Sequence, residues 1–151
     1  MEEIIPRIPR ELLLSELTPE KKLRTTNKSG NEIYIVTWQD SPNVVRELGR
    51  LREIAFRAAG GGTGLSMDLD EFDTMENPYK QLLVWDPEAQ EILGGYRYLL
   101  GSEVKLDENG QPMDGVVPMS YEYVMTNYRT MYINCLLSGM EGGSIYDGYM
   151  E

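Results

Sequence analysis

The sequence predicts an α+β domain in which helices pack against a mixed, mainly antiparallel sheet. Three segments rich in β-branched and aromatic residues, at 32–38, 81–86 and 91–100, have the composition of strands. Between the first two of them, apolar residues recur at helical spacing over residues 42–59. Only Pro87-Glu88-Ala89-Gln90 separates the last two strands, so we expect an antiparallel hairpin. The order strand, helix, loop, strand, strand places the helix on one face of the sheet.

The helix expected at 42–59 has well-marked ends. Asp40-Ser41-Pro42 supplies a cap residue and a proline at the first helical position, and Gly60-Gly61-Gly62 ends the helix. On a helical wheel Arg52 falls within the apolar arc, which is expected to face the core. An uncompensated buried charge costs several kcal/mol, so Arg52 needs a carboxylate partner. The polar face carries Arg46, Arg50, Glu53 and Arg57.

An acidic loop follows the helix and can supply that partner. Asp68, Asp70, Glu71 and Asp73 lie close together in the sequence and repel one another unless cations neutralise them. Arg97 is separated from the apolar Leu93 and Leu99 by even numbers of residues, so on a strand it shares their face and its side chain is expected to point inward. We therefore predict an ion-pair network of Arg52, Asp70, Asp73 and Arg97. An ordinary solvated acidic loop is the alternative.

Three segments of the chain, taken in order, resemble the N-terminal half of a GNAT-type N-acyltransferase: LREIAF, D-x-D-E-F-D and LLVWD…EILGGYRYLL. The branch it is most similar to contains the hemolysin-like ornithine- and glycine-lipid N-acyltransferases, which resemble the acyl-homoserine-lactone synthases. The resemblance covers residues 2–113 and implies a GNAT-like fold. The matched positions are Leu51, Arg52, Phe56, Asp70, Asp73, Gly95 and Arg97. Of these, the resemblance implies a substrate-pocket network of Arg52, Phe56, Asp70, Asp73 and Arg97.

The resemblance also implies a reaction. Such an enzyme transfers a fatty acyl group from acyl carrier protein or acyl-CoA to the amine of an amino acid or amino-lipid, as a step of lipid biosynthesis. The acyl thioester is a co-substrate, and no bound cofactor is implied. Proton removal from the amine and stabilisation of the oxyanion require positioned groups. The downstream glutamate favoured for proton removal in the family has no counterpart here, so the catalytic residues stay unknown.

The resemblance stops at Asp114. The family continues with a histidine-containing helix, a Glu-Leu-Gly-Arg strand and a phosphate-binding loop, none of which is visible in residues 114–151. We therefore divide the chain into an N-terminal helical arm (1–30), a GNAT-like half (31–113) and a divergent tail (114–151). The sheet is expected to be incomplete at the C-terminus, and the tail to add strands at its edge or stay disordered. The glycine-rich residues 139–143 are interpreted as a turn. A truncated, inactive relative is an alternative.

Within the arm, residues 1–9 are expected to be extended and loosely held, with short helices at 10–17 and 18–24. An amphipathic arm of this kind could make peripheral membrane contact, and the alternative is that the two helices only cover the sheet. The chain has no apolar run of about 18 residues and no signal-peptide pattern, so we predict a cytoplasmic protein.

Composition excludes several classes of function. The net charge of −11 argues against nucleic-acid binding. The absence of histidine excludes imidazole catalysis and the usual zinc sites. A non-enzymatic acidic module, whose acidic loop binds calcium or a basic partner, is the other alternative. An EF-hand starting at Asp68 fails because Phe72 and Asp73 occupy the fifth and sixth positions, so no metal site is predicted.

Acyl carrier proteins are acidic and should be repelled by a chain of this charge unless a local basic face exists. Arg46, Arg50 and Arg57, which share the polar side of the helix, are the predicted carrier-docking face, extended by Lys21, Lys22 and Arg24. A solvated helix face without any docking role is the alternative.

Overall fold

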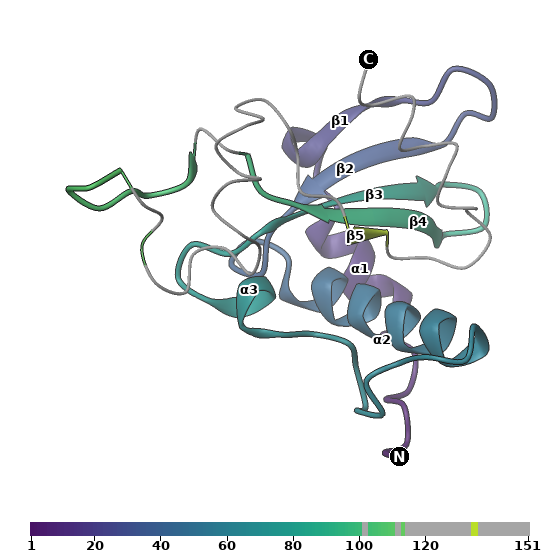
Figure 1. Ribbon diagram of the computed structural model, residues 1–151. Helices are drawn as coiled ribbons and strands as arrows, with labels where there is room; N and C mark the ends of the chain where they lie inside the picture. The colour runs from purple at the N-terminus through teal and green to yellow at the C-terminus, as the bar shows by residue number, and fades with distance from the viewer. Residues whose placement is uncertain (101–102, 111–112, 114–133, 136–151) are drawn as a thin grey trace.

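The computed structural model of the chain describes residues 1–100, 103–110, 113 and 134–135 (Figure 1). These residues form a five-stranded antiparallel sheet, in the order β1-β2-β3-β4-β5, and helices packed against it. The α+β class predicted from the sequence is confirmed. The strands are β1 (Lys22–Thr25), β2 (Glu32–Val36), β3 (Lys80–Asp86), β4 (Glu91–Tyr98) and β5 (Asn134–Cys135). The helical segments are α1 (Arg10–Glu16), the 3₁₀ turn η1 (Pro19–Lys21), α2 (Pro42–Ala58) and α3 (Glu71–Thr74).

The long helix α2 begins and ends where the sequence predicts. Pro42 is its first residue, and Gly60 and Gly62 follow its end with positive φ angles of 85° and 102°. The capping group, however, comes from another helix. The Glu16 carboxylate of α1 accepts hydrogen bonds from the backbone N–H of Asn43 (2.7 Å) and Val44 (3.1 Å). A carboxylate at a helix N-terminus satisfies free N–H groups and interacts favourably with the helix dipole.

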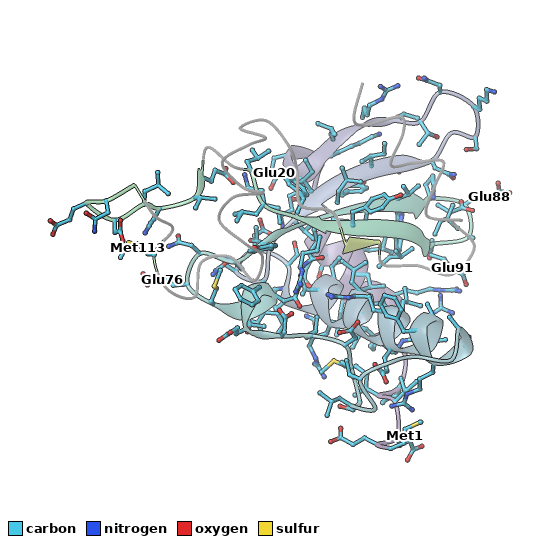
Figure 2. The ribbon with its side chains drawn as sticks, viewed as in Figure 1. Met1, Glu20, Glu76, Glu88, Glu91 and Met113 are labelled. Atoms are coloured by element: carbon cyan, nitrogen blue, oxygen red, sulfur yellow. The ribbon has the colours of Figure 1, made fainter. Side chains whose placement is uncertain are left out.

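The main core lies between one face of the sheet and helices α1 and α2, which Figure 1 shows on the same side. Figure 2 shows side chains from both layers filling this space. The sheet contributes Tyr34, Val36, Leu83 and Trp85, and the helices contribute Leu13, Val44, Val45 and Leu48. The opposite face carries a smaller cluster of Leu82, Tyr96 and Tyr98. The strands thus alternate between two apolar surfaces, as a pleated sheet requires.

A glycine pair inside a strand indicates a bulge or the close approach of a ligand or another backbone. At Gly94-Gly95 of β4 the structure has both a neighbouring bulge and a close backbone approach. The β3–β4 register shifts between Val84 and Trp85, which leaves Leu93 as the extra residue of β4. A Cβ on Gly95 would lie 2.7 Å from the carbonyl oxygen of Leu82, so only glycine fits without a backbone shift. The bulge also explains why Leu93 is exposed although Arg97 and Leu99 are buried.

The N-terminal arm differs from its prediction in two ways. No helix spans residues 18–24, because the chain makes a single 3₁₀ turn and then pairs as β1 with β2. Backbone hydrogen bonding to β2 therefore overrides the weak helical pattern. Residues 1–9 are extended but not loosely held, since the backbone N–H of Glu2 donates to Gly64 O and that of Ile8 donates to the Glu47 carboxylate.

From the tail (114–151), the structure describes Asn134 and Cys135. Asn134 and Cys135 pair with Arg97 and Tyr96 as the edge strand β5. The other predictions for residues 114–151, including the turn at 139–143, lie outside the described residues. Within the described part of the chain, no helix has the length and apolar character needed to cross a membrane.

Candidate functional site

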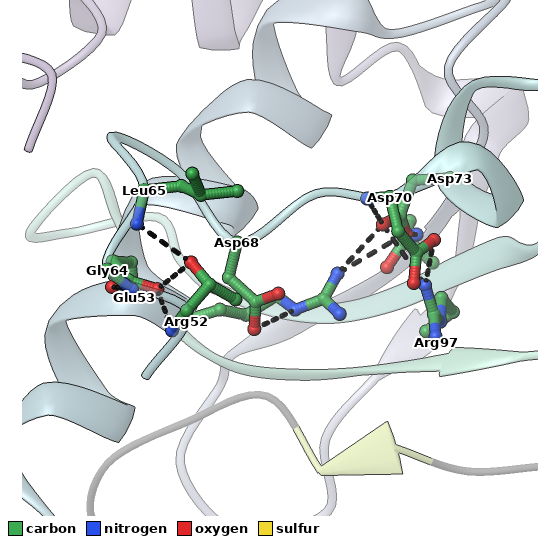
Figure 3. Close-up of polar contacts among 10 residues, drawn as sticks. Arg52, Glu53, Gly64, Leu65, Asp68, Asp70, Asp73 and Arg97 are labelled. Atoms are coloured by element: carbon green, nitrogen blue, oxygen red, sulfur yellow. Dashed lines mark hydrogen bonds and ion pairs between the residues drawn. The ribbon is translucent and has the colours of Figure 1, made fainter. Parts of the chain in front are cut away.

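Arg52 of α2 and Arg97 of β4 meet around the carboxylate of Asp73, which belongs to α3 (Figure 3). Asp73 is fully buried, and each arginine is 4% exposed. Arg52 Nη1 lies 3.3 Å from Asp73 Oδ2, and Arg97 Nη1 lies 3.1 Å from the same oxygen. One carboxylate therefore joins the long helix to the second strand of the hairpin, in the interior of the fold.

Asp73 receives two further hydrogen bonds. Gln81 Nε2 of β3 donates to Asp73 Oδ1 at 2.7 Å, and the backbone N–H of Asp70 donates to Oδ2 at 3.0 Å. With donors from both arginines, the two oxygens have four sources of hydrogen bonds or ion pairs. Such saturation is what allows a carboxylate to remain charged in a buried site.

Asp70 is the half-exposed member of the network. Its carboxylate lies 2.6 Å from Arg97 Nη1 and caps α3 by accepting a hydrogen bond from the backbone N–H of Phe72. Burial alone would raise the pKa of Asp70, but the hydrogen bond and charge of Arg97 outweigh it and lower that pKa below its ordinary value. Asp70 is therefore a stable counter-ion for Arg97.

Asp68 extends the network to the far side of Arg52. Figure 3 shows Asp68 and Asp73 on opposite sides of that guanidinium, with Asp68 Oδ2 lying 3.4 Å from Arg52 Nε. Burial raises the pKa of Asp68, the charge of Arg52 opposes this, and the charges of Asp73 and Glu53 add to it. The loop is fixed here because the backbone N–H of Asp68 donates to the carbonyl of Gly49 in α2.

Tyr79 flanks the Arg97 end of the network. The Arg97 guanidinium carbon lies 5.3 Å from the centre of the Tyr79 ring, a cation–π distance. Burial acts to lower the pKa of Arg97, but the carboxylates of Asp70 and Asp73 raise it overall. Arg97 is thus held as a permanent cation.

The structure brings together four of the five residues predicted for the substrate-pocket network: Arg52, Asp70, Asp73 and Arg97. The fifth, Phe56, is 40% exposed and takes no part in these ion pairs. The core contacts of α2 come from Val44, Val45 and Leu48, whereas Phe56 lies two turns further along, past the packed part of the helix.

Sequence reasoning missed Asp68 and Gln81. Asp68 was seen as part of the acidic loop, but its spacing did not indicate a contact with Arg52. The sequence did indicate Gln81, because residues 81, 83 and 85 are spaced by two. Gln81 therefore shares the inward face of β3 with Leu83 and Trp85. A polar residue at such a position needs a buried partner.

The arginines predicted as a carrier-docking face are not a freely exposed set. Arg50 lies 2.6 Å from Glu47, and Arg57 lies 2.7 Å from Glu53, with arginine side chains only 14% and 18% exposed. The assignment of Glu53 to a solvent-facing polar face is wrong, since its side chain is fully buried. Within the described residues, no ion pair involves Arg46.

Glu53 is buried because it anchors the glycine-rich loop. Its carboxylate accepts hydrogen bonds from Arg57 Nε, from the N–H and hydroxyl of Thr63, and from the N–H of Gly64. Burial would raise the pKa of Glu53, but these hydrogen bonds, led by that of Arg57, lower it to about 2. The loop that leads to Asp68 is thereby tied to α2.

Among the described residues, no group of three or more acidic or cysteine side chains is arranged to hold a metal ion. Oxygens of Asp70 and Asp73 are instead bonded to arginines. The arrangement is that of a buried ion-pair network joining four elements of the fold.

Residues 51–133, more than half of the chain, match the acetyltransferase (GNAT) domain family. This chain belongs to the GNAT acetyltransferase family. The matched region begins in α2 at Leu51 and includes every residue of the network, so the four joined elements belong wholly or partly to the GNAT domain.

Two curated proteins are similar to this GNAT chain. A glycine N(alpha)-acyltransferase of Phocaeicola vulgatus is 71% identical over 113 residues, which are 75% of this chain and 35% of the relative. A glycine N(alpha)-acyltransferase of Bacteroides thetaiotaomicron is also 71% identical over 113 residues, covering 75% of this chain and 34% of that protein. The chain therefore spans about a third of the length of these relatives. No solved structure matches it.

Proposed function

We propose that this chain acts in the transfer of a fatty acyl group to the amine of an amino acid, with glycine as the acceptor, in lipid biosynthesis. This assigns it to the ornithine- and glycine-lipid branch of the family. The observation that carries the proposal is the 71% identity, over 113 residues, to two glycine N(alpha)-acyltransferases. The acyl donor in this proposal is a thioester of acyl carrier protein or of CoA.

The proposed reaction is aminolysis of a thioester. The neutral amine of the acceptor attacks the carbonyl carbon, the C–N bond forms, the C–S bond breaks, and the thiol leaves with a proton. The amine must first lose its own extra proton to a base or to water. Precise placement of the amine contributes strongly to the rate of such a step.

We assign to the Arg52–Asp73–Arg97 network the task of holding the acceptor side of the site rigid. A buried ion pair is seldom more stabilising than apolar packing of the same volume, so stability alone is a weak reason for this network. Its geometry supports a positioning role, because it ties α2, α3, β3 and β4 together through one fully buried carboxylate. Asp70 is the half-exposed residue of the network, so a ligand in solvent can reach the network most directly at its side chain.

The proposal is tested by incubating the purified chain with glycine and either a fatty acyl carrier protein or the matching acyl-CoA. We expect N-acylglycine, detected by mass spectrometry, with at least one of the two donors. Omission of glycine and replacement of the chain by heat-denatured protein are the controls. Failure to form N-acylglycine from either donor, by a chain whose circular dichroism shows it to be folded, would contradict the proposed function.

Donor choice requires a separate experiment. We propose that a carrier-protein donor would approach the side of α2 that bears Arg46, Arg50 and Arg57. Because Arg50 and Arg57 neutralise Glu47 and Glu53, a variant that reverses all three charges would also disturb buried carboxylates. Arg46→Glu alone avoids this problem, and Lys28→Glu, at an exposed position, is the matched control.

We expect Arg46→Glu to weaken carrier-protein binding at low salt and to lose this effect at high salt, because surface charges are screened within about 10 Å at 0.1 M salt. Lys28→Glu should have a smaller effect. Equal binding by the parent and the Arg46→Glu variant at low salt would remove this face as the docking surface.

A further inference from the structure

Three side-chain atoms of the network are shielded from solvent and have no hydrogen-bond partner within the described structure: Arg52 Nε, Gln81 Oε1 and Arg97 Nε. Arg52 Nε still has an ion-pair partner, because Asp68 Oδ2 lies 3.4 Å away. Gln81 Oε1 and Arg97 Nε are the two that remain. Gln81 is 1% exposed and Arg97 is 4% exposed. Buried polar groups are nearly always hydrogen-bonded, so a buried acceptor and a buried donor left open in one place need an explanation.

The orientation of both groups is fixed by their other contacts. Gln81 Nε2 donates to Asp73 Oδ1 at 2.7 Å, and a carboxylate can only accept, so the amide oxygen is the free end. Arg97 uses Nη1 for Asp70 and Asp73, which leaves Nε free as a donor on another edge of the guanidinium. Neither group can turn to satisfy itself without breaking a contact to Asp73.

Gln81 and Arg97 are directly opposite each other on β3 and β4. Directly opposed antiparallel residues have Cβ atoms about 5 Å apart and side chains on the same face of the sheet. The open acceptor and the open donor therefore come from adjacent positions. A ligand that completes both needs an acceptor group for Arg97 and an N–H donor for Gln81, separated by a short distance.

The carboxylate and amino groups of an α-amino acid, which are attached to one carbon, meet this description. A carboxylate oxygen is the natural acceptor for the Arg97 cation. An amino group is the natural donor to an amide oxygen, and the carboxylates of Asp70 and Asp73, both bonded to Arg97, favour a protonated amine nearby.

We propose that Gln81 Oε1 and Arg97 Nε bind the two ends of the acceptor amino acid, with the amine on Gln81 and the carboxylate on Arg97. This inference rests on the proposed function and adds to it a subsite for the acceptor. The ring of Tyr79 packs on the Arg97 guanidinium and so limits the directions from which a ligand can reach Arg97.

The test uses the whole chain and begins with ligand variation, which leaves the protein unchanged. Glycine, acetate and methylamine are titrated into labelled protein, and the NMR signals of the Gln81 side-chain amide and the Arg97 Nε–H are followed. We expect glycine to shift both signals. Acetate, which lacks the amine, and methylamine, which lacks the carboxylate, should each bind about tenfold more weakly, the loss expected for one hydrogen bond to a charged group. Equal affinity for all three ligands, or no shift of either signal with glycine, would overturn the subsite.

A variant then tests Arg97 directly. Arg97→Lys keeps a cation beside Asp70 and Asp73 but removes Nε, and Arg7→Lys, at an exposed ion pair with Glu91, is the control. We expect Arg97→Lys to weaken glycine binding about tenfold and Arg7→Lys to leave it unchanged. A cooperative unfolding transition, followed by circular dichroism, shows whether the Arg97→Lys variant is folded. If the variant does not fold, the comparison of glycine, acetate and methylamine with the parent protein decides whether the subsite exists.

The two proposals fail in different ways. Glycine binding that depends on both ends of the ligand, without any N-acylglycine formation, would refute the transferase function and support the subsite. Formation of N-acylglycine with the same KM for glycine in the parent and in folded Arg97→Lys would support the function and refute the subsite.

Discussion

Arg52 Nη1 lies 3.3 Å from both carboxylate oxygens of Asp73, although the two residues are 21 positions apart and both are buried. The pair joins the middle of α2 to the short helix α3. Removal of one member leaves the other as an uncompensated charge in the interior, and this asymmetry gives the first prediction.

Arg52→Ala should lower the free energy of unfolding by about 3 kcal/mol, because Asp73 would lose one of its two arginines while staying buried. Arg46→Ala, on the same helix, should change it by less than about 0.5 kcal/mol. Urea unfolding followed by circular dichroism measures both. Equal stability of the two variants would show that the buried pair contributes nothing.

Glu53→Gln should destabilise the chain at pH 7 by roughly 2 kcal/mol, because a charged acceptor of four hydrogen bonds becomes a neutral amide. The pKa of Glu53 in the folded chain is about 2, below the ordinary 4.5, so its ionised form stabilises the fold above pH 4.5. That contribution is lost as the pH falls toward 2. The difference between parent and variant should therefore shrink below pH 4.5, as measured by urea unfolding from pH 3 to 7, with the exposed Glu11→Gln as control. A difference independent of pH would contradict the assignment.

Asp68→Asn should have the opposite effect and stabilise the chain at neutral pH. Burial, with the charges of Asp73 and Glu53, raises the pKa of Asp68 above its ordinary 3.8, so ionising Asp68 costs more in the folded chain than in the unfolded chain. Its contribution is fully present below pH 3.8 and is lost as the pH rises through the folded value. The gain from Asp68→Asn should thus appear at pH 7 and vanish near pH 3 in thermal unfolding experiments. The exposed Glu88→Gln should show no such trend, and destabilisation by Asp68→Asn at pH 7 would show that its pairing with Arg52 dominates.

Gly95→Ala should destabilise the chain by about 1–3 kcal/mol, since the new Cβ would lie 2.7 Å from the Leu82 carbonyl and the strands would have to shift. Gly61→Ala is the matched control, because its Cβ would lie 3.6 Å from Phe56 O, an ordinary contact. Chemical denaturation distinguishes the two. A neutral Gly95→Ala would mean that β4 can move away from β3 without cost.

Much of the fold was predictable from local chemistry. The ends of α2 follow from proline and glycine at its boundaries, and the hairpin follows from two apolar segments joined by a four-residue turn. The need of Arg52 for a carboxylate also followed from the sequence, because its place on the wheel is set by the helical repeat. The strand β1 could not be predicted in this way, since its four residues are all exposed and only the ladder with β2 defines them.

The sequence by itself determined that a buried arginine and an acidic loop had to meet, because periodicity fixes which way a side chain points and charge forbids an unpaired ion in the interior. Only the tertiary structure decided the partners. It placed Asp73 rather than Asp70 against Arg52, brought Gln81 into the network and buried Glu53 under the glycine loop. The physical reason is that hydrogen bonds and ion pairs act over about 3 Å, so the packing of α2, α3 and the hairpin selects among carboxylates that are nearly equivalent in the sequence.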